Sequence, residues 1–251
     1  MIRKLRYALP AIAIAANLAA AETPGIPPHG KPIILFNGKD LSNFDIFMRE
    51  HGLNNDSLQV FTVENGVVHV SGKEFGYFIT KQEYENYYLT AEFKWGTGTY
   101  GNREGKARDS GILYHIIGPN HVWPTSIEFQ IQEGSTGDFW MTDRAAITGK
   151  DGKRVTGPPG HAAPIDRFNK GAWKDVIDYR DPNGELEKPV GEWNFIELVV
   201  EGERARHWVN GKLANEGTGA YPAKGKILFQ SEGAEIYFRN LKLYPLKMKK
   251  K

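Results

Sequence analysis

Residues 126–132 read SIEFQIQ, an alternation of apolar and polar side chains without an exception. As a β-strand, this stretch would place its apolar side chains on one face and Glu128, Gln130 and Gln132 on the other. The apolar face predicts contact with a core. An ordinary solvated strand more often carries Lys, Thr or Ser, so the polar row predicts the lining of a groove that recognises a hydroxyl-rich ligand.

The preceding run, GILYHII at residues 111–117, is apolar on both faces, which is typical of an interior strand, and His115 is its one titratable group. Gly118-Pro119-Asn120 then predicts a turn. Aromatic and polar residues crowd the two connections that flank the Glu128 strand: His121, Trp123, Asp138 and Trp140. Aromatic rings cover the apolar faces of sugars while carboxylates and amides bind their hydroxyls, so this set of side chains favours a carbohydrate ligand.

The rest of the chain consists of short alternating runs separated by turn dipeptides such as Asn65-Gly66 and Asn210-Gly211. No helical periodicity longer than a turn or two is visible, so we expect a single all-β sandwich over residues 32–246. Between residues 141 and 191 no strand pattern persists and Pro and Gly recur. We expect a long loop insertion there, either an ordered wall over the groove or a partly disordered segment.

The N-terminus has the features of a secretory signal peptide over residues 1–21. Three basic residues precede an apolar run from Ala8 to Ala20, which ends in an Ala-x-Ala cleavage pattern. We expect an exported protein, periplasmic or secreted, with no membrane span after cleavage; an uncleaved anchor is the alternative. Residues 22–31 predict an extended lead-in, and residues 247–251 a basic tail.

Composition excludes several classes of function. Without the leader, three of the 32 basic residues disappear, which leaves 29 against 30 acidic residues. The nearly neutral mature chain has no basic stripe, so we expect no nucleic-acid partner. The absence of cysteine excludes disulfides, thiolate catalysis and a Cys-based zinc site.

The motifs then show a resemblance to a known family. They are LFNGKDLSNF from residue 35, DSGILYH from 109, SIEFQIQEG from 126, GEWNFIELVVEG from 191, HWVNGKLANE from 207 and KGKILFQSEGAEIYFRNLKLYPL from 224. In this order, over about residues 31–246, they resemble the 3-keto-disaccharide hydrolase family. The resemblance implies a concanavalin A-like jelly-roll β-sandwich. It also implies a substrate already oxidised to a ketone at C3 of a glucose-type ring, supplied by a separate glycoside 3-dehydrogenase.

The resemblance also extends to individual residues. Asp109-Ser110-Gly111 stands where many members have Asn-Ser-Gly, and the difference adds a negative charge. The further matches are Glu128, Gln130, Gln230 and Arg239, with Glu232 matching less closely. We expect the substrate to be bound by Arg108, Asp109, Gln130, Gln132, His121, Trp123, Asp138, Trp140, Gln230 and Arg239.

The implied reaction begins with the ketone, which acidifies the hydrogen on C2. A base removes that hydrogen, the glycosidic oxygen leaves from C1, and water adds to the resulting enone. We predict that Glu128 or His115 is the base and the other the acid, with Arg108, Gln130 or Arg239 near the developing oxyanion. The alternatives are a core role for His115 and a structural ion pair for Arg239.

No cofactor is predicted. A divalent metal bound by Asp109, His115 and Glu128, with His121 and Asp138 as further ligands, is an alternative that no metal-binding motif supports.

Two other functions stay open from the sequence. A glycoside hydrolase with two carboxylates at the bond usually carries Glu-x-Asp-x-x-Glu on such a fold, whereas residues 128–133 read EFQIQE, with an amide in the middle. A non-catalytic carbohydrate-binding protein is the other.

Overall fold

The protein is described by a computed structural model that covers residue 26 and residues 29–247. The predicted leader, residues 1–21, lies outside the described residues, as do most of the lead-in and all of the basic tail except Lys247. Among the described residues, the single helical element is the short 3-10 helix η1 (Gly101–Arg103). No helix in this part of the chain is long and apolar enough to cross a membrane.

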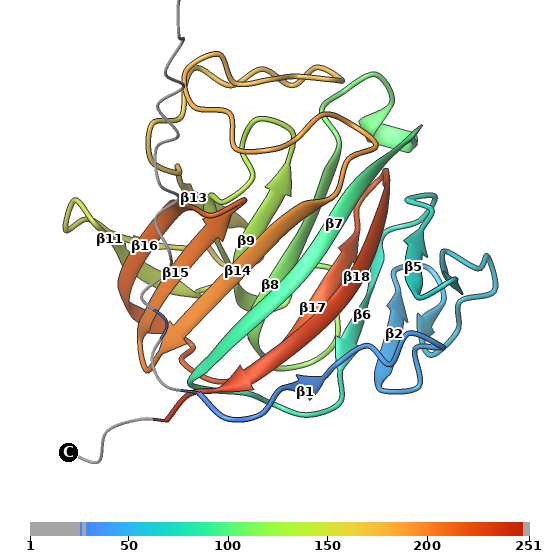
Figure 1. Ribbon diagram of the computed structural model, residues 1–251, viewed down its shortest axis with the longest axis horizontal. Coiled ribbons are helices and arrows are strands. Elements are labelled where there is room, and N and C mark those ends of the chain that lie inside the picture. Colours follow the sequence, from blue (N-terminus) through green and yellow to red (C-terminus); the bar gives the residue numbers. More distant parts are fainter. Residues whose placement is uncertain (1–25, 27–28, 248–251) are drawn as a thin grey trace, which may run out of the picture.

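Two antiparallel sheets pack against each other in the described part of the chain (Figure 1). The first has ten strands; its main path runs β12 (Arg154–Thr156), β11 (Ala146–Gly149), β16 (Lys212–Tyr221), β15 (Arg204–Val209), β14 (Asn194–Glu201), β7 (Tyr87–Thr99), β18 (Ala234–Pro245), β5 (Val67–Val70) and β4 (Phe61–Glu64), with β1 (Ile33–Ile34) paired to β18. The second has eight: β13 (Ala162–Ile165), β10 (Phe139–Thr142), β9 (Thr125–Gln132), β8 (Asp109–Ile117), β17 (Lys226–Ser231), β6 (Gly76–Thr80), β2 (Phe44–Met48) and β3 (Gly52–Leu53).

The core lies between the two sheets. Phe129 of β9 and Ile112 of β8 meet Leu89, Ile196 and Leu198 of the other sheet across a dry apolar space. Each fully buried Phe, Leu or Ile side chain contributes about 1.5–3 kcal/mol to stability. The all-β sandwich predicted from the alternating runs is therefore confirmed.

Strands β8 and β9 pair in a register that sets the polar row in place. Asp109 lies opposite Gln132, and Gly111 lies opposite Gln130. Because directly opposed residues share a face, the polar side chains of β9 and the start of β8 project together from the outer face of the eight-stranded sheet. The absent side chain at Gly111 leaves room in the middle of this face.

The expected loop insertion over residues 141–191 is wrong in its first half. Strands β10 to β13 lie between residues 139 and 165; β10 and β13 extend the eight-stranded sheet, whereas β11 and β12 extend the other. These strands have three or four residues each, too few for alternation to be visible. Residues 166–191 form no strand. An ion pair between Arg167 and Asp181 holds this segment in place; it is 2.5 Å long and both side chains are 1% exposed.

Candidate active site

A cleft of about 600 Å³ lies over the outer face of β8, β9 and β10. The polar row of β9 forms its floor, and residues from the connections after β12 and β13 form part of its wall. Residues named from the sequence that line it are Asp109, Trp123, Glu128, Gln130, Gln132, Asp138, Trp140 and Glu232. The cleft thus lies over the polar face of β9, where the alternation predicted a groove.

Asp109 is held by the two amides of β9. Gln130 Nε2 donates to its Oδ1 at 3.0 Å and Gln132 Nε2 to its Oδ2 at 2.6 Å. Burial raises the pKa of Asp109 to about 7, and the opposing effects of the Arg103 charge and the Gln132 hydrogen bond are smaller. The amides of Gln130 and Gln132 therefore orient a carboxyl group that titrates near neutral pH.

Glu128 and Gln230 approach each other over Gly111. A Cβ atom on Gly111 would lie 2.0 Å from Glu128 Oε1 and 2.6 Å from Gln230 Oε1. Both oxygens are buried and lack a hydrogen-bond partner among the described residues. Burial, followed by the charges of Glu232 and Asp109, raises the pKa of Glu128 well above its ordinary value. Glu128 is thus a carboxyl group that favours its protonated form.

Glu232 adds a further carboxyl group to the cleft from the turn between β17 and β18. Burial and the charge of Asp109 raise its pKa well above the ordinary value, as for Glu128. The positive charge of Arg103 and a hydrogen bond from Trp123 act in the other direction. Unlike Glu128, Glu232 therefore has neighbours that stabilise its ionised form.

Arg103 supplies positive charge at this end of the cleft. It comes from η1, and its guanidinium donates to the carbonyl of Ala107 and, at 3.1 Å, to Asp175. Its Nη2 lies 3.6 Å from Asp109. The sequence did not single out Arg103, because the glycine-rich charged segment 97–108 has the composition of an exposed loop.

The cleft contains a second charge pair, between Asp138 and Lys170. Asp138 binds Lys170 and accepts the backbone N–H of Arg167 at 2.8 Å. Burial raises the pKa of Asp138 to about 6, against the charge of Lys170. Sequence reasoning missed Lys170 and His161, which also line the cleft, since their positions depend on how the segment after β12 folds back.

His115, the predicted partner of Glu128, does not line the cleft. It is fully buried between the rings of Tyr87 and Tyr114, and its Nδ1 lies 2.8 Å from the carbonyl oxygen of Pro222. Its φ of 58° and the register shift of β8 between Tyr114 and Ile117 interrupt the regular alternation of side chains along the strand. Burial lowers the pKa of His115 to about 4, so it is a neutral core histidine. The acid–base role predicted for it is wrong.

Two predicted arginines are also placed elsewhere. Arg108 lies in a buried ion pair with Glu133 at 2.7 Å and also contacts Asp178 at 2.7 Å. Arg239 belongs to the ten-stranded sheet, where it pairs with Glu92 at 2.6 Å and covers the ring of Trp193. Neither lines the cleft, so the oxyanion roles predicted for them are corrected to structural ion pairs.

The alternative metal ligands are not all brought together: Asp109, Glu128 and Asp138 line the cleft, but the two histidines do not. His115 is in the core, and His121 is exposed on the connection after β8, outside the lining of the cleft. Within the described residues, no group of three or more His, Cys, Asp or Glu side chains is arranged to hold a metal ion. Asp109, Asp175 and Glu232 instead lie near the guanidinium of Arg103, and Asp138 pairs with Lys170.

Comparison with solved structures identifies the fold. Similar solved structures include a provisionally assigned glycosyl hydrolase from Parabacteroides distasonis, with 21% identity, a TM-score of 0.55, and coverage of 86% of this chain and 94% of that one. The catalytic domain of an endo-1,3-β-glucanase (laminarinase) from Thermotoga petrophila has 11% identity, a TM-score of 0.51, and coverage of 88% and 99%.

These likenesses show the concanavalin A-like jelly-roll sandwich. No curated protein matches the chain. The family described as the 3-keto-alpha-glucoside-1,2-lyase-like domain matches residues 31–244. The chain therefore belongs to the 3-keto-alpha-glucoside-1,2-lyase-like family of carbohydrate-active proteins.

Proposed function

We propose that this protein cleaves glycosides that carry a ketone at C3, by elimination across C1 and C2 followed by addition of water. The observation that supports the proposal best is the grouping of Glu128 and Glu232 with Arg103 in one cleft. Elimination next to a ketone needs a base, an acid and a group that stabilises an enolate oxygen. This cleft provides each of the three from different elements of the fold.

The environments of the two glutamates separate their roles. Arg103 and Trp123 favour the anion of Glu232, whereas no neighbour favours the anion of Glu128. Carboxyl groups that share a site hold a proton on the member whose anion is less stabilised. Glu232 is therefore the base and Glu128 the acid.

The steps conserve atoms and charge. Glu232 removes the proton from C2, and the electrons of that bond form the enolate, whose oxygen is stabilised by Arg103. The enolate expels the substituent on C1, and Glu128 gives its proton to the departing oxygen. Water then adds at C1 of the enone, and a proton returns to C2. The net change is hydrolysis of the glycosidic bond by two half-reactions, neither of which requires a covalent intermediate.

Direct hydrolysis by two strand carboxylates is less compatible with this arrangement. Glu133 occupies the last acidic position of the Glu-x-Asp-x-x-Glu pattern, but it is paired with Arg108 and does not line the cleft. The middle position is Gln130, whose amide donates to Asp109. The strand therefore offers one carboxyl group to the cleft, whereas the two-carboxylate mechanism needs a matched pair flanking the bond.

The aromatic lining suits a pyranose ring. Trp140 lies directly opposite Glu128 on the neighbouring strand, and Trp123 stands at the rim, 44% exposed. Tryptophan rings pack on the C–H faces of sugars. The proposal includes export of the mature chain and a separate dehydrogenase that oxidises C3 of the glycoside before it reaches this cleft.

The test uses the purified mature protein with a 3-keto-glucoside and with its unoxidised parent in deuterated water. We expect release of the aglycone from the keto substrate alone, with deuterium at C2 of the sugar. Cleavage of both compounds without exchange would instead establish direct hydrolysis. Binding of either compound without cleavage would identify a carbohydrate-binding protein.

A further inference from the structure

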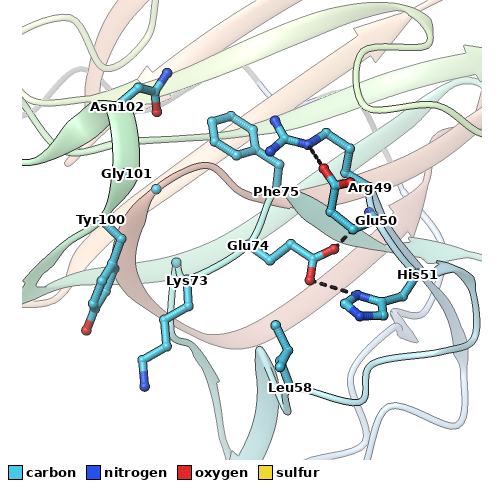
Figure 2. Close-up of a pocket in the computed structure, with 12 residues that line it drawn as sticks. Arg49, Glu50, His51, Leu58, Lys73, Glu74, Phe75, Tyr100, Gly101 and Asn102 are labelled. Carbon is cyan, nitrogen blue, oxygen red and sulfur yellow. Dashed lines mark hydrogen bonds and ion pairs between the residues drawn. The ribbon is translucent and has the colours of Figure 1, made fainter.

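Beside the active-site cleft lies a second hollow of about 540 Å³ (Figure 2). We infer that this hollow binds the leaving unit of the substrate, and that this unit is a neutral hydroxylated group such as a second sugar. The inference rests on the proposed function and extends it to the other side of the bond that breaks.

The hollow and the cleft have a common wall. In three pairs of neighbouring residues, one member lines the hollow and the other lines the cleft. Asn102 lines the hollow and Arg103 the cleft, and in the same way Gly233 follows Glu232. The third pair is a ring contact, since Phe75 of the hollow meets Trp123 of the cleft edge to face, 6.2 Å between centroids. The hollow and the active-site cleft are therefore adjacent at Arg103 and Glu232.

Glycine residues form part of the hollow near this wall. The backbone N–H of Tyr100 donates to the carbonyl of Gly233 at 2.7 Å, which joins the two segments. Gly101 lines the hollow with a φ of 59°, and a Cβ atom there would meet no atom within 4 Å. A Cβ atom on Gly72 would lie 2.4 Å from the backbone of Ala234, so a larger residue at position 72 would displace that backbone.

The charged groups of the hollow largely satisfy one another. Figure 2 shows Arg49, Glu50 and His51 on one side and Tyr100 on the other. Arg49 pairs with Glu50 at 2.7 Å, and Glu74 accepts from His51 at 2.9 Å. With both carboxylates engaged, the hollow presents no strong excess of one charge, and a neutral ligand suits it better than an anion or a cation.

The groups that stay available are hydrogen-bonding ones. Among the described residues, neither the Lys73 ammonium nor the Asn102 amide has a side-chain partner, and both residues are exposed at the hollow. The ring of Tyr100 lies on the same side of the hollow as these two residues (Figure 2). Donors and an amide beside an aromatic ring recognise the hydroxyls and C–H faces of a sugar, the same chemistry that the cleft uses.

The test compares two keto substrates that differ only in the leaving unit, a 3-keto-disaccharide and methyl 3-keto-glucoside. Lys73→Ala removes a donor, and Asn102→Trp places a bulky ring in the hollow. The matched control is Lys212→Ala, an exposed lysine of the β15–β16 hairpin that lines neither space. For both hollow variants we expect kcat/KM for the disaccharide to fall about tenfold or more relative to that for the methyl glycoside.

Equal effects on both substrates, or no effect, would overturn the inference. Calorimetric binding of the unoxidised disaccharide and of methyl glucoside to the same variants separates this inference from the proposed function. Should the wild-type protein cleave neither keto substrate, the proposed reaction fails, but a selective loss of disaccharide affinity in Lys73→Ala and Asn102→Trp would still support the hollow as a second sugar site. Unchanged disaccharide affinity in both variants would refute it.

Discussion

Glu128 and Gln230 come together over Gly111, each with a buried side-chain oxygen that no described residue binds. Two buried acceptors without a hydrogen-bond partner cost free energy unless a proton or a ligand donor lies between them. A protonated Glu128 resolves this conflict, in agreement with the raised pKa of its carboxyl group. The relationship links the burial of β9 to the acid role proposed for Glu128.

Gly111→Ala tests whether this space is needed. The new methyl group would overlap Glu128 Oε1 and Gln230 Oε1, and the two side chains would have to move. We expect kcat to fall about 100-fold, as for an ångström-scale displacement of a reacting group, with a loss of about 1–3 kcal/mol in unfolding free energy. The control is Gly30→Ala, where the nearest atom to the new Cβ is 3.6 Å away. Wild-type kcat in Gly111→Ala would contradict the role of this contact.

Glu128→Gln separates the acid from the base. An amide cannot protonate the departing oxygen, so we expect turnover of a keto-disaccharide to fall by about 10²–10⁴. A nitrophenolate leaving group needs no proton, and its release should fall much less. Exchange of the C2 hydrogen in deuterated water should persist in Glu128→Gln and disappear in Glu232→Gln. If Glu128→Gln abolishes exchange while Glu232→Gln retains it, the two roles are reversed.

Local pattern was sufficient for the strands that build the floor of the cleft. The alternation of residues 126–132 predicted both the buried face of β9 and its polar row, because each side chain's direction depends only on its neighbours in the strand. The role predicted for His115 rested instead on its being the one titratable group in the apolar run 111–117. A register shift in β8 turns this residue into the core, and no residue within the apolar run indicates such a shift.

The groups that complete the site come from connections, and their positions depend on long-range packing. Arg103 is fixed by η1 and by Asp175, which follows it by 72 residues. Glu232 lies on a turn whose place is set by the pairing of β17 and β18 with different sheets. Composition alone makes both look like solvent-exposed charges, so the sequence predicted Glu128 and the polar floor of the groove, Glu232 only as a looser family match, and Arg103 not at all.

Arg103→Ala removes the positive charge from the cleft. That charge lowers the pKa of both Glu232 and Asp109, although burial outweighs it. In the variant the pKa of Glu232 should rise further, so the acidic limb of the kcat/KM profile should move to higher pH. We also expect kcat to fall about 10²–10³-fold through loss of enolate stabilisation. Arg204→Ala, an exposed arginine paired with Glu216, is the control. An unmoved acidic limb would exclude this role for Arg103.

Glu187 provides a pH test that is independent of the reaction. It is buried, accepting from Trp95 Nε1 at 2.8 Å and Thr136 Oγ1 at 2.6 Å, and burial raises its pKa from 4.5 to about 8. Between these pH values the folded protein retains a proton that the unfolded chain releases, so the free energy of unfolding falls as pH rises, by at most about 1.4 kcal/mol per pH unit from this group.

Asp109 and Glu128 act on stability in the same direction as Glu187, since their pKa values are also raised. The informative quantity is therefore the difference in slope between the wild-type protein and Glu187→Gln, measured by urea unfolding from pH 5 to pH 8. We expect the variant to lose stability less steeply as pH rises, even if its stability at pH 5 is lower because an amide cannot accept both hydrogen bonds equally well. Exposed Glu192→Gln should keep the wild-type slope. Parallel pH curves for the wild-type protein and Glu187→Gln would mean that Glu187 is already ionised in the folded state at pH 5.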